Sequence, residues 1–245
     1  MDALRAQVSQ RETASRTIDV RIGAFWTLVV VETGGEIQAG LAATLQESPH
    51  AHGERPSVRD AGNLRVRTPL QLADLAHSAS PLEAALNALL LLDESACTKE
   101  NARDLLLARG AGKRVAMIGH FPFANELRKA ARSLWVLELN PQEGDLPAEK
   151  AAEILPLADV VAITGTTLIN HTFDSLIPLC REDAYVVMLG GTTPLSPLLF
   201  TYGVDVAAGT RLTDVEAALN AVSEGATYHQ IPGKRLLTLA ADKRS

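Results

Sequence analysis

Aromatic residues, cysteines and long apolar segments are scarce in this sequence, and each shortage excludes a class of protein. Phe, Trp and Tyr make up 4% of the 245 residues, so we expect a core of Leu, Val, Ile and Ala, as in α/β proteins. The longest apolar run, residues 84–92, is interrupted by Asn87 and is too short to cross a membrane. The two cysteines, Cys97 and Cys180, lie far apart, which predicts a reducing compartment and no disulfide framework.

Basic clusters and a targeting segment are missing as well. Lys and Arg total 23 against 29 Asp and Glu, which gives a net charge of −6 without any basic run. Neither nucleic acid nor a membrane is therefore expected as a partner. The polar N-terminus lacks the apolar core of a signal peptide. We expect a cytoplasmic protein with a small-molecule or metal ligand, and a homodimer is one open expectation.

The usual catalytic motifs are also absent. The sequence contains no G-x-S-x-G nucleophile turn, no G-x-x-x-x-G-K-[ST] phosphate loop and no H-E-x-x-H zinc motif. Two histidines, His50 and His52, lie close together in the stretch 47–62, whose composition predicts a loop of unassigned role. Such a pair is more often solvated than bound to a metal, so the metal ligands stay unknown. Whether the protein is an enzyme is left open.

The first half of the sequence predicts a small α+β domain over residues 1–97. Two β-rich runs flank Gly34-Gly35, which predicts a hairpin with a glycine turn. Thr68-Pro69 predicts the start of a helix, and residues 80–83 carry the Ser, Pro and Glu of a capping box ahead of a buried apolar helix. Strands followed by helices, without alternation, are typical of α+β folds.

The second half, residues 98–245, predicts a Rossmann-like doubly wound parallel sheet. Strands that are near-continuous Val, Ile and Leu runs alternate with helices there, which is typical of a sheet covered on both faces. The expected strands are 114–119, 134–139, 159–164, 184–189 and 204–207. The expected helices that separate them are 124–132, 148–155, 172–180, 194–202 and 214–224.

The candidate site lies at the carboxyl ends of these strands. Ligands of open parallel sheets bind there, near the point where the strand order switches. Four loops rich in Gly, Thr, Asn and Pro follow the expected strands, at residues 119–123, 140–145, 165–170 and 190–194. The polar residues of the second half are therefore expected to gather at one edge of the sheet.

The first of these loops imitates a dinucleotide-binding turn without completing it. Gly119 with Glu138 nineteen positions later has the spacing of a turn glycine and a ribose-binding carboxylate. The other two glycines of that motif are missing, and Pro122 has no N–H for a pyrophosphate. Alternation along the second strand also makes Asn140, rather than Glu138, the residue that clears the sheet. The sequence thus carries no strong NAD fingerprint.

Two further loops favour an anionic ligand. The stretch TGTTLINHT offers hydroxyls and an amide just ahead of a predicted helix, and GGTTPLSP repeats the pattern with Pro194 at the first helical position. Two helix N-termini on neighbouring strands can converge on one phosphate or carboxylate. The alternative is that these residues only cap helices and satisfy turn amides. Histidine is the residue type whose unperturbed pKa lies near neutrality, and His120 is the histidine of the four loops, so it is the candidate catalytic residue.

The combined pattern IGHFPF, LELNPQEGDLP, ADVVAITGTTLINHTFDSL and GGTTPLSPLLFTYGVD resembles a prokaryotic family described as heavy-metal-chelation proteins, formerly a domain of unknown function. The first half resembles the family's companion domain, whose fold is similar to the enolase N-terminal domain. The resemblance implies a site in the cleft between the enolase-like and Rossmann-like domains, which holds a metal or another small ligand. The positions that it assigns to ligand binding are Asn87, Gly119, His120, Pro122, Asn140, Pro141, Thr164, Gly165, Thr166, Asn170, Gly190, Thr193 and Pro194.

Three functions remain open from the sequence. The first is binding of a small polar or anionic ligand, because hydroxyls, amides and glycines suit an oxygen-rich molecule or a chelated metal better than a bare soft metal. The second is an enzyme that uses NAD(P) or S-adenosylmethionine on the parallel sheet. The third is lyase or hydrolase chemistry with His120 as general acid or base beside a carboxylate.

Overall fold

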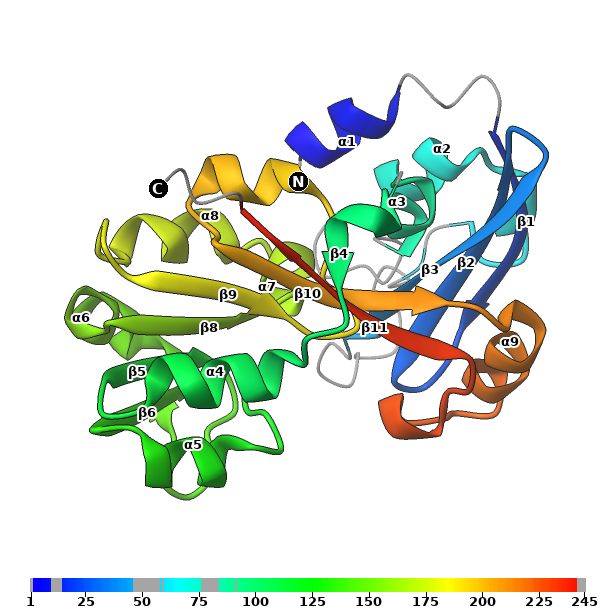
Figure 1. Ribbon diagram of the computed structural model, residues 1–245. Helices are drawn as coiled ribbons and strands as arrows, with labels where there is room; N and C mark the ends of the chain where they lie inside the picture. The colour runs from blue at the N-terminus through cyan, green and yellow to red at the C-terminus, as the bar shows by residue number, and fades with distance from the viewer. Residues whose placement is uncertain are drawn as a thin grey trace. The chain divides into compact units, whose positions relative to one another are not determined.

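The chain folds into two compact units (Figure 1). The computed structural model describes residues 2–9, 15–45, 58, 60–75, 84–90 and 92–241. The first unit comprises residues 1–92, 168–171 and 210–235, and the second comprises residues 93–167, 172–209 and 236–245. The segment 210–235 thus groups with the N-terminal part of the chain, and the domain boundary expected at 97/98 stays a prediction. The two units are described one at a time.

The first unit is built on a three-stranded antiparallel sheet. Its strands are β1 (Ser15–Ile22), β2 (Trp26–Thr33) and β3 (Glu36–Ala43), in the order β1-β2-β3. Strands β2 and β3 pair from Thr33↔Glu36 onward, and the two turn residues Gly34 and Gly35 have φ of 60° and 82°. Two-residue hairpins of this kind need positive φ at both positions, which glycine adopts without strain. The predicted glycine-turn hairpin is confirmed.

Short helices pack on both sides of this sheet. They are α1 (Asp2–Ser9), η2 (Leu64–Val66), α2 (Pro69–Asp74), α3 (Ala84–Leu89), α9 (Val215–Ser223) and η9 (Tyr228–Gln230). Helix α2 begins as predicted, with a reciprocal capping box between Thr68 and Gln71. Helix α3 lies directly on β3, since a Cβ on Gly40 would lie 2.1 Å from the carbonyl oxygen of Ala84. The capping box predicted at 80–83, and His50 and His52, lie outside the described residues.

The second unit contains an eight-stranded sheet in the order β4-β11-β10-β9-β8-β5-β6-β7. Its strands are β4 (Cys97–Thr98), β5 (Arg114–Ile118), β6 (Ser133–Glu138), β7 (Leu146–Pro147), β8 (Val160–Thr164), β9 (Tyr185–Leu189), β10 (Val206–Leu212) and β11 (Lys234–Ala240). The six strands from β7 to β10 are parallel, and their order is that of a doubly wound sheet with its switch point between β5 and β8. Every strand predicted in the second half lies in this sheet, whereas the short strand β7 and the antiparallel pair of β4 and β11 were not predicted.

The helices of the second unit differ from the predictions in several places. They are η4 (Glu94–Ala96), α4 (Ala102–Gly110), α5 (Ala124–Ala130), η5 (Ala148–Lys150), α6 (Ala151–Ile154), η6 (Leu155–Leu157), α7 (Thr166–Ile169), α8 (Phe173–Leu176), η7 (Ile177–Leu179) and η8 (Pro197–Tyr202). The helix predicted over 148–155 consists of three short segments over residues 148–157, and the helical turn over residues 166–169 was not predicted. The helix predicted over 172–180 is split into α8 and η7, because Pro178 has no N–H for the α-helical ladder. The helix predicted from Pro194 begins instead at Pro197, where the Ser196 side chain accepts the Leu198 N–H and caps it.

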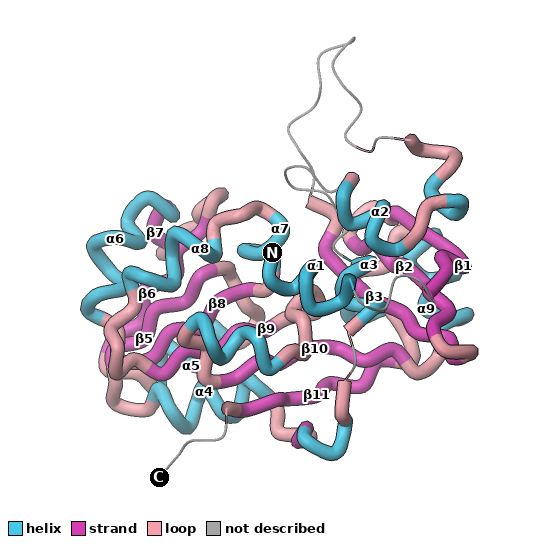
Figure 2. The backbone as a smooth tube through the Cα atoms, turned by 90° about the horizontal axis from the view of Figure 1, so that it is seen from above, coloured by secondary structure: helices cyan, strands magenta, loops and turns pink. Residues whose placement is uncertain are grey.

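The core of the second unit lies between the central strands and the helices on either face of the sheet. Helices α4 and α5 lie on one face and α8 on the other (Figures 1 and 2). Val115 and Met117 of β5 are fully buried and pack in one cluster with Leu106 of α4 and Leu127 of α5. This arrangement confirms the predicted α/β fold class, with a parallel-rich sheet and a separate small antiparallel sheet. The likeness of the first unit to the enolase N-terminal domain stays a prediction.

Candidate functional site

The switch point places two glycine turns side by side at the carboxyl edge of the parallel sheet. Gly119 follows β5 with φ of 95°, and Gly165 follows β8. A Cβ on Gly119 would lie 3.0 Å from Cγ2 of Thr164, and a Cβ on Gly165 would lie 2.6 Å from the backbone nitrogen of Thr193. Glycine is therefore required at both positions for the neighbouring strand ends to approach each other. The carboxyl ends of β5, β8 and β9 form one continuous edge.

The turn after β5 is held by backbone hydrogen bonds to the end of β6. The Gly119 N–H donates to the Leu137 carbonyl at 3.0 Å, and the His120 N–H donates to Glu138 Oε1 at 2.7 Å. Glu138 Oε2 accepts the N–H of Leu139 at 3.0 Å. Both oxygens of the Glu138 carboxylate are thus engaged by main-chain donors. Glu138 fixes the two strand ends to each other, and this role was not predicted from the sequence.

The side chain of His120 forms a close pair with Asp145. Nδ1 of the imidazole lies 3.0 Å from Oδ2 and 3.2 Å from Oδ1 of the carboxylate. The Asp145 side chain is 0% exposed, whereas that of His120 is 32% exposed. Among the described residues, Nε2 of His120 has no hydrogen-bond partner, so it is the nitrogen that remains for a ligand.

The loop between β6 and β7 explains how Asp145 reaches this position. Gly144 has φ of 89°, and the Asp145 N–H donates to the Gln142 carbonyl at 3.0 Å, which closes a tight turn. Asp145 Oδ2 in turn accepts the Gln142 N–H at 3.2 Å. Strand β7 then pairs with β6, Leu146 opposite Leu137, and this pairing draws the carboxylate back toward the end of the sheet. In the sequence, Asp145 is only the last residue of the polar loop 140–145.

The threonine loop after β8 is closed on itself. The hydroxyl oxygens of Thr164 and Thr166 lie 3.0 Å apart, the Thr166 N–H donates to Thr164 Oγ1 at 3.3 Å, and the Thr167 hydroxyl donates to the Thr164 carbonyl at 2.8 Å. Helix α7 begins within this loop at Thr166 and is only four residues long. The Thr164 and Thr166 hydroxyls thus stabilise the turn as well as lining the edge.

The loop after β9 is a buried turn. Gly190 has φ of 117°, and its carbonyl accepts the Thr193 N–H at 3.0 Å. Thr193 is 3% exposed, lies between Gly165 and Gly209, and its hydroxyl has no hydrogen-bond partner. Pro194 is buried beside it. Thr193 and Pro194 pack beneath the surface of the carboxyl edge, and their contact with a ligand stays a prediction.

The structure gathers most of the sequence-predicted site residues at this edge. Pro122, Asn140 and Pro141 lie exposed in the loops after β5 and β6. Two predicted residues, Asn87 and Asn170, belong instead to the first unit. The Asn87 side chain donates from Nδ2 to the Leu41 carbonyl of β3 at 2.9 Å, which explains a polar residue in the apolar helix α3. The ligand roles of all these residues stay predictions.

The described residues do not contain a group of three or more His, Cys, Asp or Glu side chains that could hold a metal ion. Cys97 of β4 and Cys180, which follows η7, are not joined by a disulfide. His120 and Asp145 are a pair, and Glu138 is turned to backbone donors. The edge therefore offers one imidazole nitrogen, several hydroxyls and exposed loop amides.

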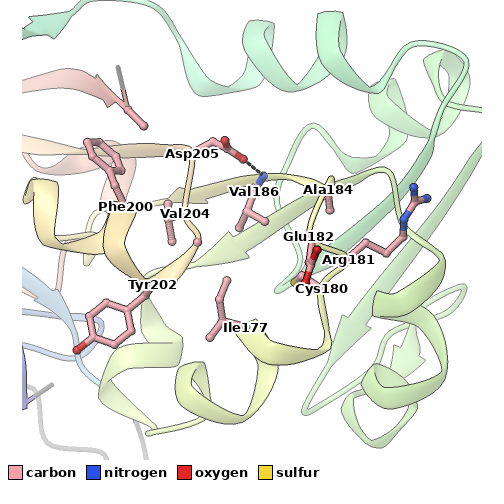
Figure 3. Close-up of a pocket in the computed structure, with 12 residues that line it drawn as sticks. Ile177, Cys180, Arg181, Glu182, Ala184, Val186, Phe200, Tyr202, Val204 and Asp205 are labelled. Carbon is pink, nitrogen blue, oxygen red and sulfur yellow. Dashed lines mark hydrogen bonds between the residues drawn. The ribbon is translucent and has the colours of Figure 1, made fainter. Parts of the chain in front are cut away.

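The opposite, amino edge of the same sheet contains a pocket of about 330 Å³ (Figure 3). Apolar side chains such as Ile177, Val186 and Phe200 line it together with the Cys180 thiol. The Asp205 carboxylate accepts the Val186 N–H at 2.8 Å and so closes the start of β9 (Figure 3). Burial raises the pKa of the Cys180 thiol to about 11, so the thiol is protonated at neutral pH.

A second carboxylate at the amino edge is held by arginines. Asp159 Oδ2 accepts from the backbone and from Nε of Arg114, both at 3.0 Å, and Oδ1 lies 2.6 Å from Nη2 of Arg114 and 2.8 Å from Nη1 of Arg181. Hydrogen bonds from Arg114 hold the pKa of Asp159 far below its usual range. The amino edge thus uses its charged groups to fix the strand starts.

The chain is similar to proteins whose names assign no activity. "Uncharacterized protein MJ0500" of Methanocaldococcus jannaschii is 29% identical over 224 residues, 86% of this chain and 85% of that protein. A crystal structure of a DUF364 family protein of unknown function from Pyrococcus horikoshii (PH1506) matches with a TM-score of 0.78 at 20% identity, over 97% of this chain and 98% of that chain. A DUF364 family protein of unknown function from Desulfitobacterium hafniense matches with a TM-score of 0.75 at 22% identity, over 98% of each chain. At these identities the two structures support the fold alone.

Two family models together match most of the sequence. Residues 7–90 match DUF4213, and residues 101–241, more than half of the chain, match DUF364; both models carry the description "Putative heavy-metal chelation". The resemblance read from the four motifs is confirmed by these matches. The chain belongs to the DUF364 family.

Proposed function

We propose that this protein binds a small polar or anionic molecule, free or carrying a metal, at the carboxyl edge of its parallel sheet. The observation that carries this proposal is the His120–Asp145 pair at the carboxyl end of β5, with Nε2 of the imidazole left without a partner among the described residues. A buried carboxylate that orients a partly exposed imidazole is a common feature of ligand and catalytic sites. The implied location of the ligand between the two domains stays a prediction.

A bare heavy-metal ion fits this edge poorly. Soft metals prefer thiolates and imidazoles in sets of three or four, and no group of three such side chains converges within the described residues. The hydroxyls of Thr164 and Thr166 and the amide of Asn140 are donors that suit carboxylates, phosphates and hydroxyl-rich molecules. The family description agrees with these hydroxyl and amide donors if the metal is bound by a small molecule, which the protein then binds.

A dinucleotide or S-adenosylmethionine is disfavoured by the main chain of the turn after β5. The N–H groups of Gly119 and His120 are already engaged by Leu137 and Glu138, and Pro122 has none. Each oxygen of the Glu138 carboxylate already accepts one main-chain N–H, so a ribose hydroxyl would have to share an oxygen with a backbone donor. Titration with NAD(P)H and S-adenosylmethionine at millimolar concentration tests this alternative, and saturable binding of either would reinstate it.

Acid–base catalysis in the same place is the second candidate function. An imidazole whose Nδ1 is held by a buried carboxylate can accept a proton at Nε2, and the carboxylate stabilises the imidazolium that forms. Discrimination from simple binding requires a retained ligand that changes chemically during incubation with the protein. An unchanged ligand recovered after prolonged incubation would favour binding alone.

Native mass spectrometry of untagged protein, purified without chelators, tests the proposed function. We expect a non-covalent mass adduct in the wild-type protein that is lost in His120→Gln and kept in His229→Gln, a matched control on η9. Elemental analysis of the same samples reports whether a metal accompanies the adduct. Wild-type protein without an adduct, and without a thermal shift from polar anions or metal chelates, would contradict the proposal.

The expectations of a cytoplasmic location, a homodimer and no nucleic-acid or membrane partner stay predictions. Within the described residues, none of the helices is both long and apolar enough to span a bilayer.

A further inference from the structure

We propose that His120 Nε2 supplies a single coordination position to a metal that is already held by a small chelator. The ligand class is then a metal chelate with one open or exchangeable position, bound through its polar groups and through this one imidazole. The inference rests on the proposed function, because it names the chemistry of the molecule that the carboxyl edge would take.

The hydrogen bond to Asp145 determines which nitrogen is available. Both carboxylate oxygens lie within 3.2 Å of Nδ1, so Nδ1 carries the proton and the neutral ring has its lone pair on Nε2. Asp145 cannot easily turn away, because its side chain is 0% exposed and also accepts the Gln142 N–H. Carboxylates that accept from the far nitrogen of a histidine both orient it and raise its basicity as a metal ligand.

The surroundings limit the protein to this one strong donor. The Glu138 carboxylate is engaged by the backbone of His120 and Leu139, and the hydroxyl oxygens of Thr164 and Thr166 lie within hydrogen-bond distance of each other. A bare metal ion would therefore keep most of its water ligands and bind weakly. A chelator supplies the remaining coordination positions itself, so one imidazole completes the set for Cu²⁺, Ni²⁺ or Zn²⁺, the metals that imidazole suits.

The loops around His120 offer contacts for the chelator rather than for the metal. Asn140 and Pro141 are exposed in the loop that Asp145 closes, and Gly119 has no side chain of its own beside His120. Chelators are typically rich in carboxylate and hydroxyl groups, which amides and main-chain donors bind well. In this arrangement His120 binds the metal, and the loops bind the organic part of the chelate.

Titration with Cu²⁺–iminodiacetate tests this inference. The protein is the untagged full chain with His50 and His52 replaced by Ala, because closely spaced histidines bind this probe by themselves. Electron paramagnetic resonance of the bound probe should show hyperfine coupling to one imidazole nitrogen that is absent in His120→Gln and retained in His229→Ala and His171→Ala. Asp145→Asn should weaken calorimetric binding by about 10–100-fold, the usual effect of losing the carboxylate behind a metal-bound histidine. Iminodiacetate without metal should not give the imidazole signal.

A second measurement keeps the inference falsifiable if a variant folds poorly. Long-range ¹H–¹⁵N spectra of the wild-type imidazoles should show His120 protonated at Nδ1, in contrast to the Nε2–H tautomer that free histidine prefers. The Nε2–H tautomer at His120, or equal probe binding by wild type and His120→Gln, would overturn the inference. The adduct in native mass spectra tests the proposed function, and the copper probe tests the inference. An adduct that is lost in His120→Gln, without any imidazole–copper signal in the wild-type protein, therefore refutes the inference alone.

Discussion

The two edges of the parallel sheet contain similar residues and use them in opposite ways. At the amino edge, Asp159 is held by the guanidinium groups of Arg114 and Arg181, which stay charged at every physiological pH. At the carboxyl edge, Asp145 is held against the imidazole of His120, which keeps a second nitrogen with a lone pair. A carboxylate paired with arginine is fully satisfied and fixes the fold, whereas one paired with histidine orients a group that can still act on a ligand.

Glycines mark the same contrast. At the carboxyl edge, Gly119 and Gly165 lie so close to Thr164 and Thr193 that a methyl group would collide. At the amino edge, Gly112 precedes β5 with φ of 68°, and nothing lies within 4 Å of where its Cβ would be. Gly119 and Gly165 are needed for the close approach of the strand ends, whereas Gly112 is needed only for its turn. Substitutions at Gly165 and Gly112 should therefore differ in their cost to stability.

The largest loss of stability is expected for Gly165→Ala. The added Cβ would lie 2.6 Å from the Thr193 nitrogen and 2.7 Å from its hydroxyl oxygen, so β8 and the loop after β9 must move apart. Overpacking of this kind costs about 3 kcal/mol in the free energy of unfolding, measured by urea denaturation. Gly112→Ala, the amino-edge control, should cost about 1 kcal/mol from its positive φ alone. Equal losses of unfolding free energy in the two variants would show that the close contact at Gly165 adds no cost beyond that of a strained turn.

The next largest effect is expected for Asp159→Asn at the amino edge. The amide loses the charge-assisted bonds to Arg114 and Arg181, and because the site is partly exposed we expect a loss of about 1–2 kcal/mol in the free energy of unfolding at pH 7. The adduct seen in native mass spectra should be unchanged. Loss of the adduct together with the stability would mean that the amino edge also serves the ligand.

Acidification sharpens the same contrast. The pKa of Asp159 is lowered on folding, so the stability that this group contributes is complete above its unfolded pKa of about 3.9 and is lost as the pH falls toward the lower folded pKa. Between pH 7 and pH 3, the wild-type protein should lose more unfolding free energy than Asp159→Asn. Parallel losses in the two proteins, measured by urea denaturation at each pH, would show that the ion pair contributes little.

A smaller effect is expected for Glu138→Gln at the carboxyl edge. The variant keeps one oxygen acceptor for the two N–H groups of His120 and Leu139, so one main-chain bond is lost at a cost of about 1 kcal/mol. The looser turn should also weaken binding of the copper probe, whereas Asp159→Asn should not. Unaltered probe affinity in Glu138→Gln would show that the Glu138 bonds do not position His120.

The smallest effect on the protein is expected at Cys180. With a pKa of about 11, against 9.0 for an ordinary thiol, its thiolate fraction at pH 8 is about 100-fold lower, so alkylation by iodoacetamide should be slower in the folded protein than in the unfolded one. Peptide mass spectrometry measures the rate, and unfolding in urea should restore ordinary reactivity. Fast alkylation of the folded protein would show that the amino-edge pocket does not shield the thiol.

The strands of the second unit could be predicted from the sequence because their pattern is local. Residues 115–118 and 160–163 of β5 and β8 are continuously apolar, and a glycine directly follows each strand. Strand β11 (Lys234–Ala240) was missed because it begins with two charged residues and lies well beyond the last predicted helix, 214–224. The start of η8 was misplaced because Pro194 and Pro197 both satisfy the rule for a first helical residue, and only the Ser196 cap decides between them.

The candidate site was predictable as a set of loops but not as a set of contacts. Parallel strands bring their carboxyl ends together, so His120 and Thr164 could be placed at one edge from the strand pattern alone. The pairing of His120 with Asp145 depends on the short strand β7 and the turn at Gly144, which bring together residues 25 positions apart. No periodicity in the sequence reports such a turn, because two residues of β7 carry too little pattern.

The most direct test of this account compares Asp145→Asn with Asp159→Asn in native mass spectra of untagged protein purified without chelators. Both substitutions replace a carboxylate by an amide in the same sheet, one at each edge. We expect Asp145→Asn to lose most of the small-molecule adduct and Asp159→Asn to retain it at the wild-type level. Equal retention by the two variants, or loss only in Asp159→Asn, would contradict the assignment of the ligand to the carboxyl edge.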